Sequence, residues 1–288
     1  MSVILCDPDN LQTTTITNPL ASGDPISKGK AMNQFRAYLR ALKESGIEVF
    51  RSSSEALNTA LKNYDLTYAA NWGAFIPIDG IRPTFVLSRM AANHRRGEAV
   101  HVKPFLESLG FEVIDLPASQ FAIFEGQADV KISHGGSHIW ITYGIRTNQE
   151  GARAYAALVR AIAKKAGKKI PTFHFLKMIR PEYYHSDLCI FVDDDRCIMR
   201  PTAFSTASAR ELERVFDRGF NIFDSDEEPF ALNMYKAGKH LFARPLTERT
   251  RQMFARILKC RHVHQINLSE IEKGGGSLKC ITLAIHDY

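Results

Sequence analysis

The stretch KAMNQFRAYLRALKESGIEVF, residues 30–50, joins a helical pattern directly to a strand pattern. Apolar side chains recur at helical spacing, at Phe35, Leu39 and Leu42. Gly46 follows at the position where helices commonly end, and the IEVF run after it favours a strand. The stretch therefore predicts one helix–strand unit of an α/β protein.

The same alternation recurs along the chain. Helices are expected over residues 102–110, 151–167, 208–218 and 247–259. Strands are expected near residues 67–70, 84–87, 111–116, 122–125, 139–142, 188–192 and 280–285. No long linker rich in Pro, Gly or Ser separates two halves, so the sequence predicts a single catalytic domain over residues 1–288.

Polar residues follow the predicted strands at near-equal intervals. They are Asn18, Asn71, Glu125, His185, Asn233 and Cys280, with gaps of 53, 54, 60, 48 and 47 residues. Five such gaps indicate five αβ units, each about 50–60 residues long, arranged as a five-bladed propeller. Each unit would then offer one strand-end side chain to a common centre.

Composition and charge exclude several classes of protein. The 288 residues are 45% hydrophobic, without a run of eighteen apolar residues, and the start MSVILCDPDN does not read as a signal peptide. The net charge of +6 comes from scattered basic residues, and the densest group, residues 164–169, lies at a predicted helix end that favours cations. We therefore expect neither a nucleic acid nor a membrane as partner, whereas a homo-oligomer stays open.

The cysteines favour a reducing compartment. They are Cys6, Cys189, Cys197, Cys260 and Cys280, an odd number without any C-x-x-C pair. This usage predicts a cytoplasmic protein in which one thiol carries chemistry and the others are small buried hydrophobes.

The strongest local signal is SEIEKGGGSLKCITLAI, residues 269–285. Gly274, Gly275 and Gly276 allow the backbone to approach a ligand closely. Cys280 follows at the start of an apolar strand, and the two lysines at 273 and 279 would favour its thiolate. The alternative is a flexible hairpin with a buried cysteine.

Two acidic motifs could assist such a thiolate. In PEYYHSDLCIFV, residues 181–192, a strand would project His185 and Asp187 to the same face. A histidine beside a carboxylate can act as an oriented or protonated general acid/base. In FEGQADV, Glu125 and Asp129 flank a turn glycine, and a carboxylate there could bind a cation or relay protons. The alternatives are a polar strand end and a turn with two solvated acids.

Arginine and histidine motifs complete the candidates. Arg146 in YGIRTN could clamp a substrate carboxylate, with a surface arginine as the alternative. Arg95, Arg96 and Glu98 in NHRRGEA form a charged cluster, and most such clusters are solvated faces or ion-pair networks. His262 and His264 lack a third ligand at recognisable spacing, so we predict no metal and no organic cofactor.

Taken in order, the motifs resemble one superfamily, which holds the arginine deiminases, dimethylarginine dimethylaminohydrolases, amidinotransferases and arginine dihydrolases. The matching runs are TNPLA, AANWG, NHRRGE, FEGQAD, YGIRTN, YHSD, ALN and EKGGGSLKC, which together span residues 17–280. The resemblance implies the five-bladed α/β propeller called the pentein fold. It also implies attack by a cysteine on a guanidino carbon, followed by loss of ammonia or an amine.

The resemblance assigns roles residue by residue. Cys280 becomes the nucleophile and His185 the general acid/base, with Glu125 orienting His185 or holding a substrate nitrogen. The implied substrate ligands are Asn71, Asp187, Arg146, Asn18, Gly274, Asp129 and Arg96. The implied substrate is an arginine-like amino acid.

One departure from the family pattern bears on the substrate. Deiminases and dimethylarginine enzymes usually carry Asp where this chain has Asn71, whereas arginine dihydrolases carry Asn. A neutral carboxamide both donates and accepts hydrogen bonds, so it also suits a neutral ureido group. The sequence thus favours an arginine dihydrolase or deiminase. A dimethylarginine dimethylaminohydrolase, a citrulline hydrolase, an amidinotransferase and a catalytically silent arginine sensor remain as alternatives.

Overall fold

The computed structural model describes residues 1–13, 18–57, 65–225 and 228–285. These residues form five three-stranded sheets in two compact units. Unit 1 comprises Met1–Ala70 and Asp224–Ile285, and unit 2 comprises Asn71–Phe223. The prediction of a single domain stays a prediction.

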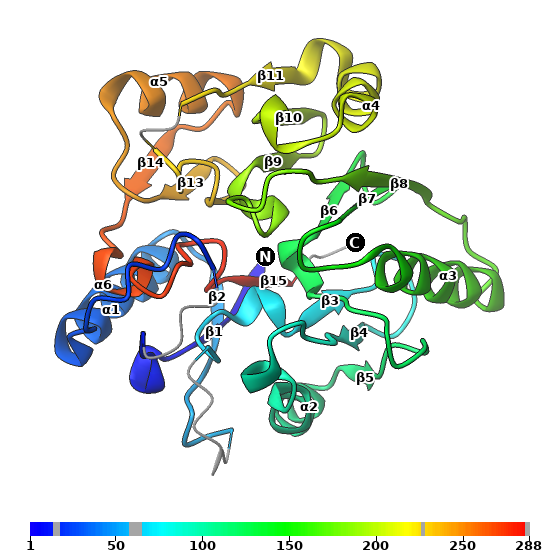
Figure 1. Ribbon diagram of the computed structural model, residues 1–288, viewed down its shortest axis with the longest axis horizontal. Helices are drawn as coiled ribbons and strands as arrows, with labels where there is room; N and C mark the ends of the chain where they lie inside the picture. Colours follow the sequence, from blue (N-terminus) through cyan, green and yellow to red (C-terminus); the bar gives the residue numbers. More distant parts are fainter. Residues whose placement is uncertain (14–17, 58–64, 226–227, 286–288) are drawn as a thin grey trace. The chain divides into compact units, whose positions relative to one another are not determined.

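Unit 2 contains three sheets with the same strand order (Figure 1). Their strands are β3 (Gly73–Phe75), β4 (Thr84–Leu87) and β5 (Glu112–Ile114); β6 (Val130–Ser133), β7 (His138–Tyr143) and β8 (Thr172–Lys177); β9 (Ile190–Asp193), β10 (Arg196–Met199) and β11 (Phe220–Ile222). In each sheet the first strand runs antiparallel to the middle strand and the third runs parallel to it.

Unit 1 contains two sheets of the same design. One has β12 (Tyr235–Ala237), β13 (His240–Ala243) and β14 (His262–Gln265). The other has β15 (Leu283–Ile285), β1 (Ser2–Cys6) and β2 (Glu48–Ser52). Here the strand that pairs antiparallel with the middle strand is β15, which is far from β1 in the sequence; Val3 of β1 pairs with Ala284.

One helix joins the middle strand of every sheet to its third strand, as a parallel pair requires. These helices are α1 (Lys28–Glu44), α2 (Glu98–Ser108), α3 (Gln149–Lys165), α4 (Thr206–Phe216) and α5 (Glu248–Ile257), and a short α6 (Ser269–Glu272) lies outside the pattern. Short 3-10 helices are η1 (Pro8–Asn10), η2 (Ala69–Asn71), η3 (Asn93–Arg95), η4 (Gly126–Ala128), η5 (Ser186–Leu188), η6 (Pro201–Ala203) and η7 (Asp217–Gly219). The repeat is therefore strand–strand–helix–strand, five times over.

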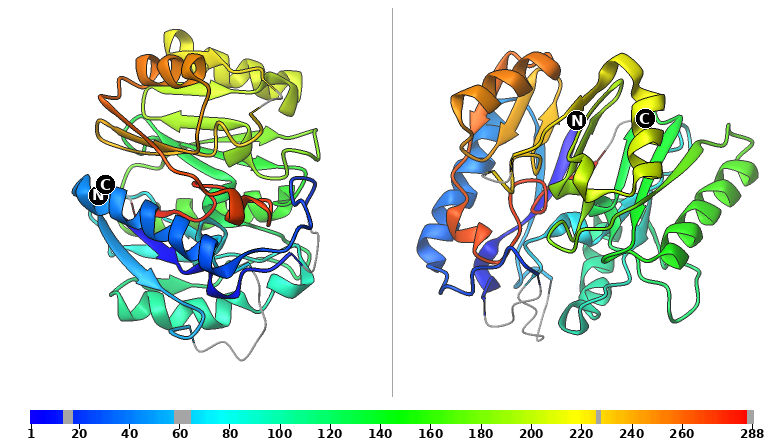
Figure 2. Two further views of the ribbon diagram at one scale, coloured as in Figure 1. Left: turned by 90° about the vertical axis from the view of Figure 1, so that its left-hand side faces the viewer. Right: turned by 45° about the horizontal axis from the view of Figure 1, so that its top comes forward.

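Helix α3 shows why these sequences form these elements. The side chain of Asn148 caps it by accepting a hydrogen bond from the N–H of Gly151. Its buried face presents Tyr155, Val159 and Ala163 at intervals of four residues against β7 and its sheet (Figures 1 and 2). Full burial of a side chain such as Val159 contributes roughly 1.5–3 kcal/mol, so packing rather than intrinsic propensity holds the helix in place.

Three of the predicted strands differ in the structure. Residues 67–70 run from the end of a turn into η2, which begins at Ala69, and residues 122–125 form only an isolated bridge between Phe124 and Arg89. Residues 280–285 form a strand only over β15, so Cys280 lies in a turn before the strand. These runs are apolar because they are buried, and burial alone does not provide a partner strand.

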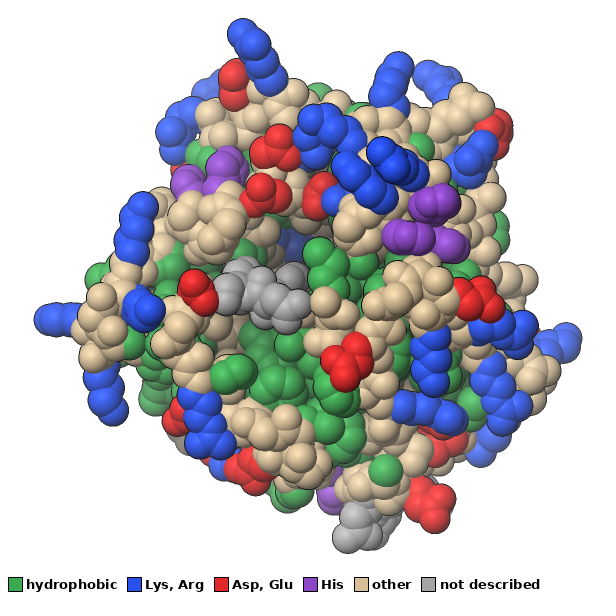
Figure 3. Space-filling model, turned by 180° about the vertical axis from the view of Figure 1, so that it is seen from behind, with side chains coloured by type: hydrophobic (Ala, Val, Ile, Leu, Met, Phe, Trp, Pro, Cys, Tyr) green, Lys and Arg blue, Asp and Glu red, His purple; other side chains and the backbone are tan. Residues whose placement is uncertain are grey.

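The surface carries charges of both signs. Figure 3 shows Lys and Arg side chains interspersed with Asp and Glu on the face in view. Among the described residues, none of the helices combines the length and the apolar character that crossing a bilayer requires. All five cysteines are free thiols.

Candidate active site

The repeat gives the candidate residues equivalent positions. Each lies two to five residues before the strand that pairs antiparallel with the middle strand of a sheet: Asn71 before β3, Glu125 before β6, His185 before β9, Asn233 before β12 and Cys280 before β15. The expectation that they follow strands is therefore wrong, whereas the spacing from Asn71 to Cys280 matches the repeat of the sheets. Asn18 lies between η1 and α1 and stands outside this series.

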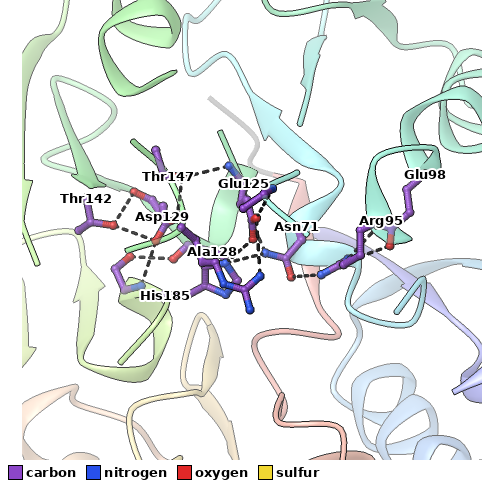
Figure 4. A network of polar contacts seen from close by, with 12 residues as sticks. Asn71, Arg95, Glu98, Glu125, Ala128, Asp129, Thr142, Thr147 and His185 are labelled. Atoms are coloured by element: carbon purple, nitrogen blue, oxygen red, sulfur yellow. Dashed lines mark hydrogen bonds and ion pairs between the residues drawn. The ribbon is translucent and has the colours of Figure 1, made fainter. Parts of the chain in front are cut away.

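In unit 2, Glu125 and His185 form a buried carboxylate–imidazole pair (Figure 4). Oε2 of Glu125 lies 2.7 Å from Nε2 of His185, and Oε1 accepts a hydrogen bond from the N–H of Ala91 at 2.8 Å. Burial acts to raise the pKa of Glu125, but the hydrogen bond and charge of His185, with the charges of Arg146 and Arg95, outweigh it and hold the pKa at about 2. Because the carboxylate is ionised, Nε2 of His185 carries the proton of this hydrogen bond.

Asp129, which is also buried, accepts hydrogen bonds from neighbouring side chains and from the backbone. Its carboxylate accepts hydrogen bonds from Oγ1 of Thr142 at 3.0 Å, Oγ1 of Thr147 at 2.7 Å and the N–H of Ser186 at 3.1 Å. Thr147 Oγ1 in turn accepts the N–H of Glu125 at 3.0 Å. Asp129 thus holds the backbone at Glu125, through Thr147, and at Ser186, next to His185. Its role as a substrate ligand stays a prediction.

Asn71 joins the pair to a second buried ion pair. Its Nδ2 lies 3.3 Å from Nε2 of His185 and 3.4 Å from the carbonyl oxygen of Glu125, and its Oδ1 accepts from Nη1 of Arg95 at 3.2 Å. Nε and Nη2 of Arg95 donate to the two carboxylate oxygens of Glu98 at 2.6 and 2.8 Å. Arg95 is 4% exposed and Glu98 1%, so this part of the NHRRGEA cluster is not a solvated face.

The remaining candidates of unit 2 take different positions. Nη1 of Arg146 lies 3.8 Å from Oε1 of Glu125, and its guanidinium lies 5.4 Å from the ring centroid of Tyr184. Asp187 is buried in η5, so the expectation that it shares a strand face with His185 is wrong. Arg96 is exposed. The roles of Arg146, Asp187 and Arg96 as substrate ligands stay predictions.

In unit 1, Cys280 is held by a carboxamide. Oδ1 of Asn233 accepts the N–H groups of Lys279 at 2.8 Å and Cys280 at 3.2 Å, and Nδ2 lies 3.2 Å from Sγ of Cys280. A backbone N–H only donates, so the amide oxygen faces the backbone and the amide N–H faces the sulfur. This donor favours the thiolate over the thiol.

The two lysines expected to favour the thiolate contact other groups. Nζ of Lys273 lies 2.9 Å from Glu270, and Nζ of Lys279 donates to the carbonyl oxygen of Thr282 at 2.8 Å. The sequence placed Asn233 in the repeat but gave it no role. Its equivalence with Cys280 in the series was the signal that could have found it.

The glycine loop is packed against side chains of its own unit. Gly275 has a φ of +94°, and a Cβ there would lie 2.1 Å from Oδ1 of Asn18. A Cβ at Gly274 would lie 2.3 Å from Oη of Tyr68, while the carbonyl of Gly274 accepts from Nδ2 of Asn18 at 3.3 Å. The loop therefore requires glycine for close approach, and the approaching groups are Asn18 and Tyr68.

Metal ligands do not gather in the part of the chain that the structure describes. No group there of three or more His, Cys, Asp or Glu side chains could hold a metal ion. His262 and His264 lie on β14, and His138 begins β7 after a turn that contains His134 at a φ of 53°.

The chain is similar to proteins of arginine metabolism. It is 31% identical over 225 residues to the N(G),N(G)-dimethylarginine dimethylaminohydrolase of Mycobacterium tuberculosis, covering 77% of this chain and 66% of that protein. It is 26% identical over 292 residues to the bifunctional arginine dihydrolase/ornithine cyclodeaminase ArgZ of Synechocystis, covering 98% of this chain but 37% of that protein. The chain therefore matches about two thirds or less of these relatives.

Solved structures confirm the fold. The crystal structure of the N-terminal domain of ArgZ bound to product superimposes with a TM-score of 0.82 at 25% identity, covering 98% of this chain and 96% of that one. A dimethylarginine dimethylaminohydrolase adduct with 4-chloro-2-hydroxymethylpyridine gives a TM-score of 0.69 at 20% identity, covering 98% of both chains. The predicted five-bladed α/β propeller and the resemblance to the guanidino-modifying superfamily are confirmed.

The family itself is decided by a match over nearly the whole chain. Residues 6–287 match the family described as N,N dimethylarginine dimethylhydrolase, eukaryotic. This range contains the Glu125–His185 pair as well as Cys280 with its Asn233 donor. The chain therefore belongs to the N,N dimethylarginine dimethylhydrolase family.

Proposed function

We propose that this protein is a cysteine-dependent hydrolase that attacks the guanidino or ureido carbon of arginine or an arginine derivative. The observation that carries the proposal is the buried pair of Glu125 and His185, in which an ionised carboxylate holds a protonated Nε2. The amide N–H of Asn233 on the sulfur of Cys280 supplies the matching nucleophile.

The chemistry follows from these groups. The Cys280 thiolate adds to the guanidino carbon, and His185 gives a proton to the departing nitrogen, which leaves as ammonia. Water then loses a proton to His185 and adds to the carbon, the C–S bond breaks, and the thiolate returns with a ureido product. Glu125 and Asp187 would neutralise the cationic guanidinium, and Arg146 would pair with the substrate carboxylate.

Asn71 favours a second round on the ureido product, which makes arginine dihydrolase our first candidate. Its oxygen is engaged by Arg95, so its amide N–H groups face His185 and Glu125. An N–H donor suits the neutral carbonyl oxygen of a ureido group. A second attack would release another ammonia, and hydrolysis of the resulting thiocarbamate would give carbon dioxide and ornithine. ArgZ, named as an arginine dihydrolase, supports this candidate.

Dimethylarginine dimethylaminohydrolase is the second candidate. The family match over residues 6–287 and the Mycobacterium tuberculosis relative favour it. The chemistry is the same, with dimethylamine leaving in place of ammonia. We further propose a cytoplasmic location, which the five free thiols support, whereas a homo-oligomer stays a prediction.

A product assay tests the proposal. Wild-type protein and Cys280→Ala would be incubated with L-arginine and, separately, with asymmetric dimethylarginine, while ornithine, citrulline, ammonia and dimethylamine are resolved. Ornithine with about two ammonia per arginine supports the dihydrolase. Accumulating citrulline contradicts it, and dimethylamine release supports the second candidate. Turnover by Cys280→Ala equal to wild type would sink both.

A further inference from the structure

We propose that Arg95 is a positioning residue that fixes the carboxamide of Asn71 with its N–H groups toward the site, and so selects a ureido oxygen over a guanidinium nitrogen. This inference rests on the proposed function and specifies the ligand group that Asn71 recognises.

The orientation of Asn71 follows from donor and acceptor chemistry. A guanidinium has only donors, so the group of Asn71 that lies 3.2 Å from Nη1 of Arg95 must be the carboxamide oxygen. The NH2 group then points the opposite way, toward the Glu125 carbonyl at 3.4 Å and His185 at 3.3 Å. Figure 4 shows this chain of contacts from Glu98 through Arg95 to Asn71.

One N–H of Asn71 is left for a ligand. Nε2 of His185 uses its proton to donate to Glu125 at 2.7 Å, so it offers no lone pair to the amide of Asn71. The carbonyl oxygen of Glu125 takes one of the two N–H groups. The second can meet the oxygen of a ureido group, whereas a guanidinium would present another donor in the same place.

The ion pair that holds Arg95 is itself built rigidly. Glu98 is the first residue of α2, where the helix dipole stabilises a carboxylate, and both of its oxygens accept from Arg95. The bidentate pair uses Nε and Nη2, which leaves Nη1 for Asn71. A lysine at 95 has one nitrogen and cannot hold both partners in this planar geometry.

Ligand affinity tests the proposal without requiring turnover. In the Cys280→Ala background, the dissociation constants of L-citrulline and L-arginine would be measured by calorimetry with and without Arg95→Lys. We expect the citrulline constant to rise roughly tenfold, the effect of one misdirected hydrogen bond, while the arginine constant stays or falls. A general structural defect would weaken both ligands together.

Two further variants isolate the route through Asn71. In an Asn71→Ala background, Arg95→Lys should leave the ratio of the two constants unchanged, because the group it orients is gone. Arg214→Lys is the matched control, since Arg214 holds Glu211 through the same Nε and Nη2 geometry at the same spacing but on the surface. Glu98→Gln provides a second test if Arg95→Lys folds poorly.

The failures of the two proposals are distinguishable. Equal loss of both ligands in Arg95→Lys, or a changed ratio in the Asn71→Ala background, overturns the positioning role and leaves the hydrolase intact. If the Arg95-intact protein binds neither ligand, the proposed function fails. The positioning role is then decided by NMR of the Asn71 side-chain amide: unchanged resonances in Arg95→Lys overturn it, and a shift supports it.

Discussion

Two asparagines, one in each unit, are oriented by the same rule. The oxygen of Asn233 accepts the backbone N–H groups of Lys279 and Cys280, and the oxygen of Asn71 accepts from the guanidinium of Arg95. A backbone N–H and a guanidinium cannot accept a hydrogen bond. The NH2 group of Asn233 therefore faces the sulfur of Cys280, and that of Asn71 faces His185 and the carbonyl oxygen of Glu125. Isosteric replacement by Asp would reverse the polarity at these points.

Asn233→Asp should slow the reaction of Cys280 with iodoacetamide about tenfold at neutral pH. The substitution removes an N–H donor and places a negative charge 3.2 Å from the sulfur, which disfavours the thiolate. Mass spectrometry of Cys280 alkylation against pH would measure the effect. Asn221→Asp serves as control, because the Asn221 side chain donates to the carbonyl of Gly219 rather than to a sulfur. An unchanged pH profile in Asn233→Asp would contradict the role.

Glu125→Gln should lower stability at pH 7 by about 3 kcal/mol, the usual cost of breaking a buried ion pair. The folded pKa of Glu125, about 2, lies below its ordinary value of 4.5. The carboxylate therefore stabilises the fold fully above pH 4.5, and this contribution is lost as the pH falls toward 2. Denaturant unfolding from pH 7 to pH 3 should show a weaker acid dependence in the variant. Glu107→Gln, at an exposed site on α2, should match wild type within about 0.5 kcal/mol.

At the scale of elements, two sheets carry the same histidine arrangement. Nδ1 of His138 on β7 lies 2.9 Å from Nε2 of His174 on β8, and Nδ1 of His240 on β13 lies 2.9 Å from Nε2 of His264 on β14. An aromatic ring two residues beyond the middle-strand histidine stacks on the partner ring in both sheets. Each contact requires one protonated and one unprotonated nitrogen, so both rings of a pair cannot be charged without losing it.

These pairs should make the protein lose stability as the pH falls below 6.5. Burial lowers the pKa of His138, with His174, His134, Lys169 and Arg214 adding to it, and burial lowers the pKa of His174 against the opposing effect of Glu211. The folded protein therefore binds fewer protons than the unfolded chain in this range, and acid favours unfolding. Thermal melts from pH 7.5 to 5.5 should show a smaller decrease in Tm for His174→Gln than for wild type. An equal decrease would contradict this.

The sequence predicted helices better than strands. Helices α1 and α3 carry long periodic patterns with clear ends, and their predicted positions are correct within a few residues. Strands such as β3 and β11 have three residues each, too few to show a period of two, and depend on a distant partner strand.

The candidate site shows the same limit. The motifs predicted Glu125, His185 and Cys280 as candidate site residues, because residue type and spacing can be read from the sequence alone. They could not show the contacts of Asn233 with the sulfur or of Arg95 with Asn71. Those depend on hydrogen bonds between residues 24 to 47 positions apart, which no local pattern encodes.

At the scale of the whole molecule, the proposed reaction requires Cys280 and His185 to act on one substrate. When two residues act together in one step, the losses of rate caused by replacing each of them do not add in free energy. Cys280→Ala and His185→Ala should each reduce kcat by several orders of magnitude, and the double variant should be no slower than the slower single variant. Single-turnover assays on the substrate that the product assay identifies would measure this. If the loss of kcat in the double variant equals the product of the two single losses, the two residues have independent roles.

The pairing of β1 with β15 has a consequence for synthesis on the ribosome. The described part of unit 2 is one continuous segment, residues 71–223, so all its strands are synthesised before β15. Strand β1 is synthesised before the strands of unit 2, yet it lacks one neighbour until residues 283–285 have been made. We therefore expect the nascent chain to expose an unpaired edge of β1 until β15 has been synthesised, and such an edge is prone to aggregation.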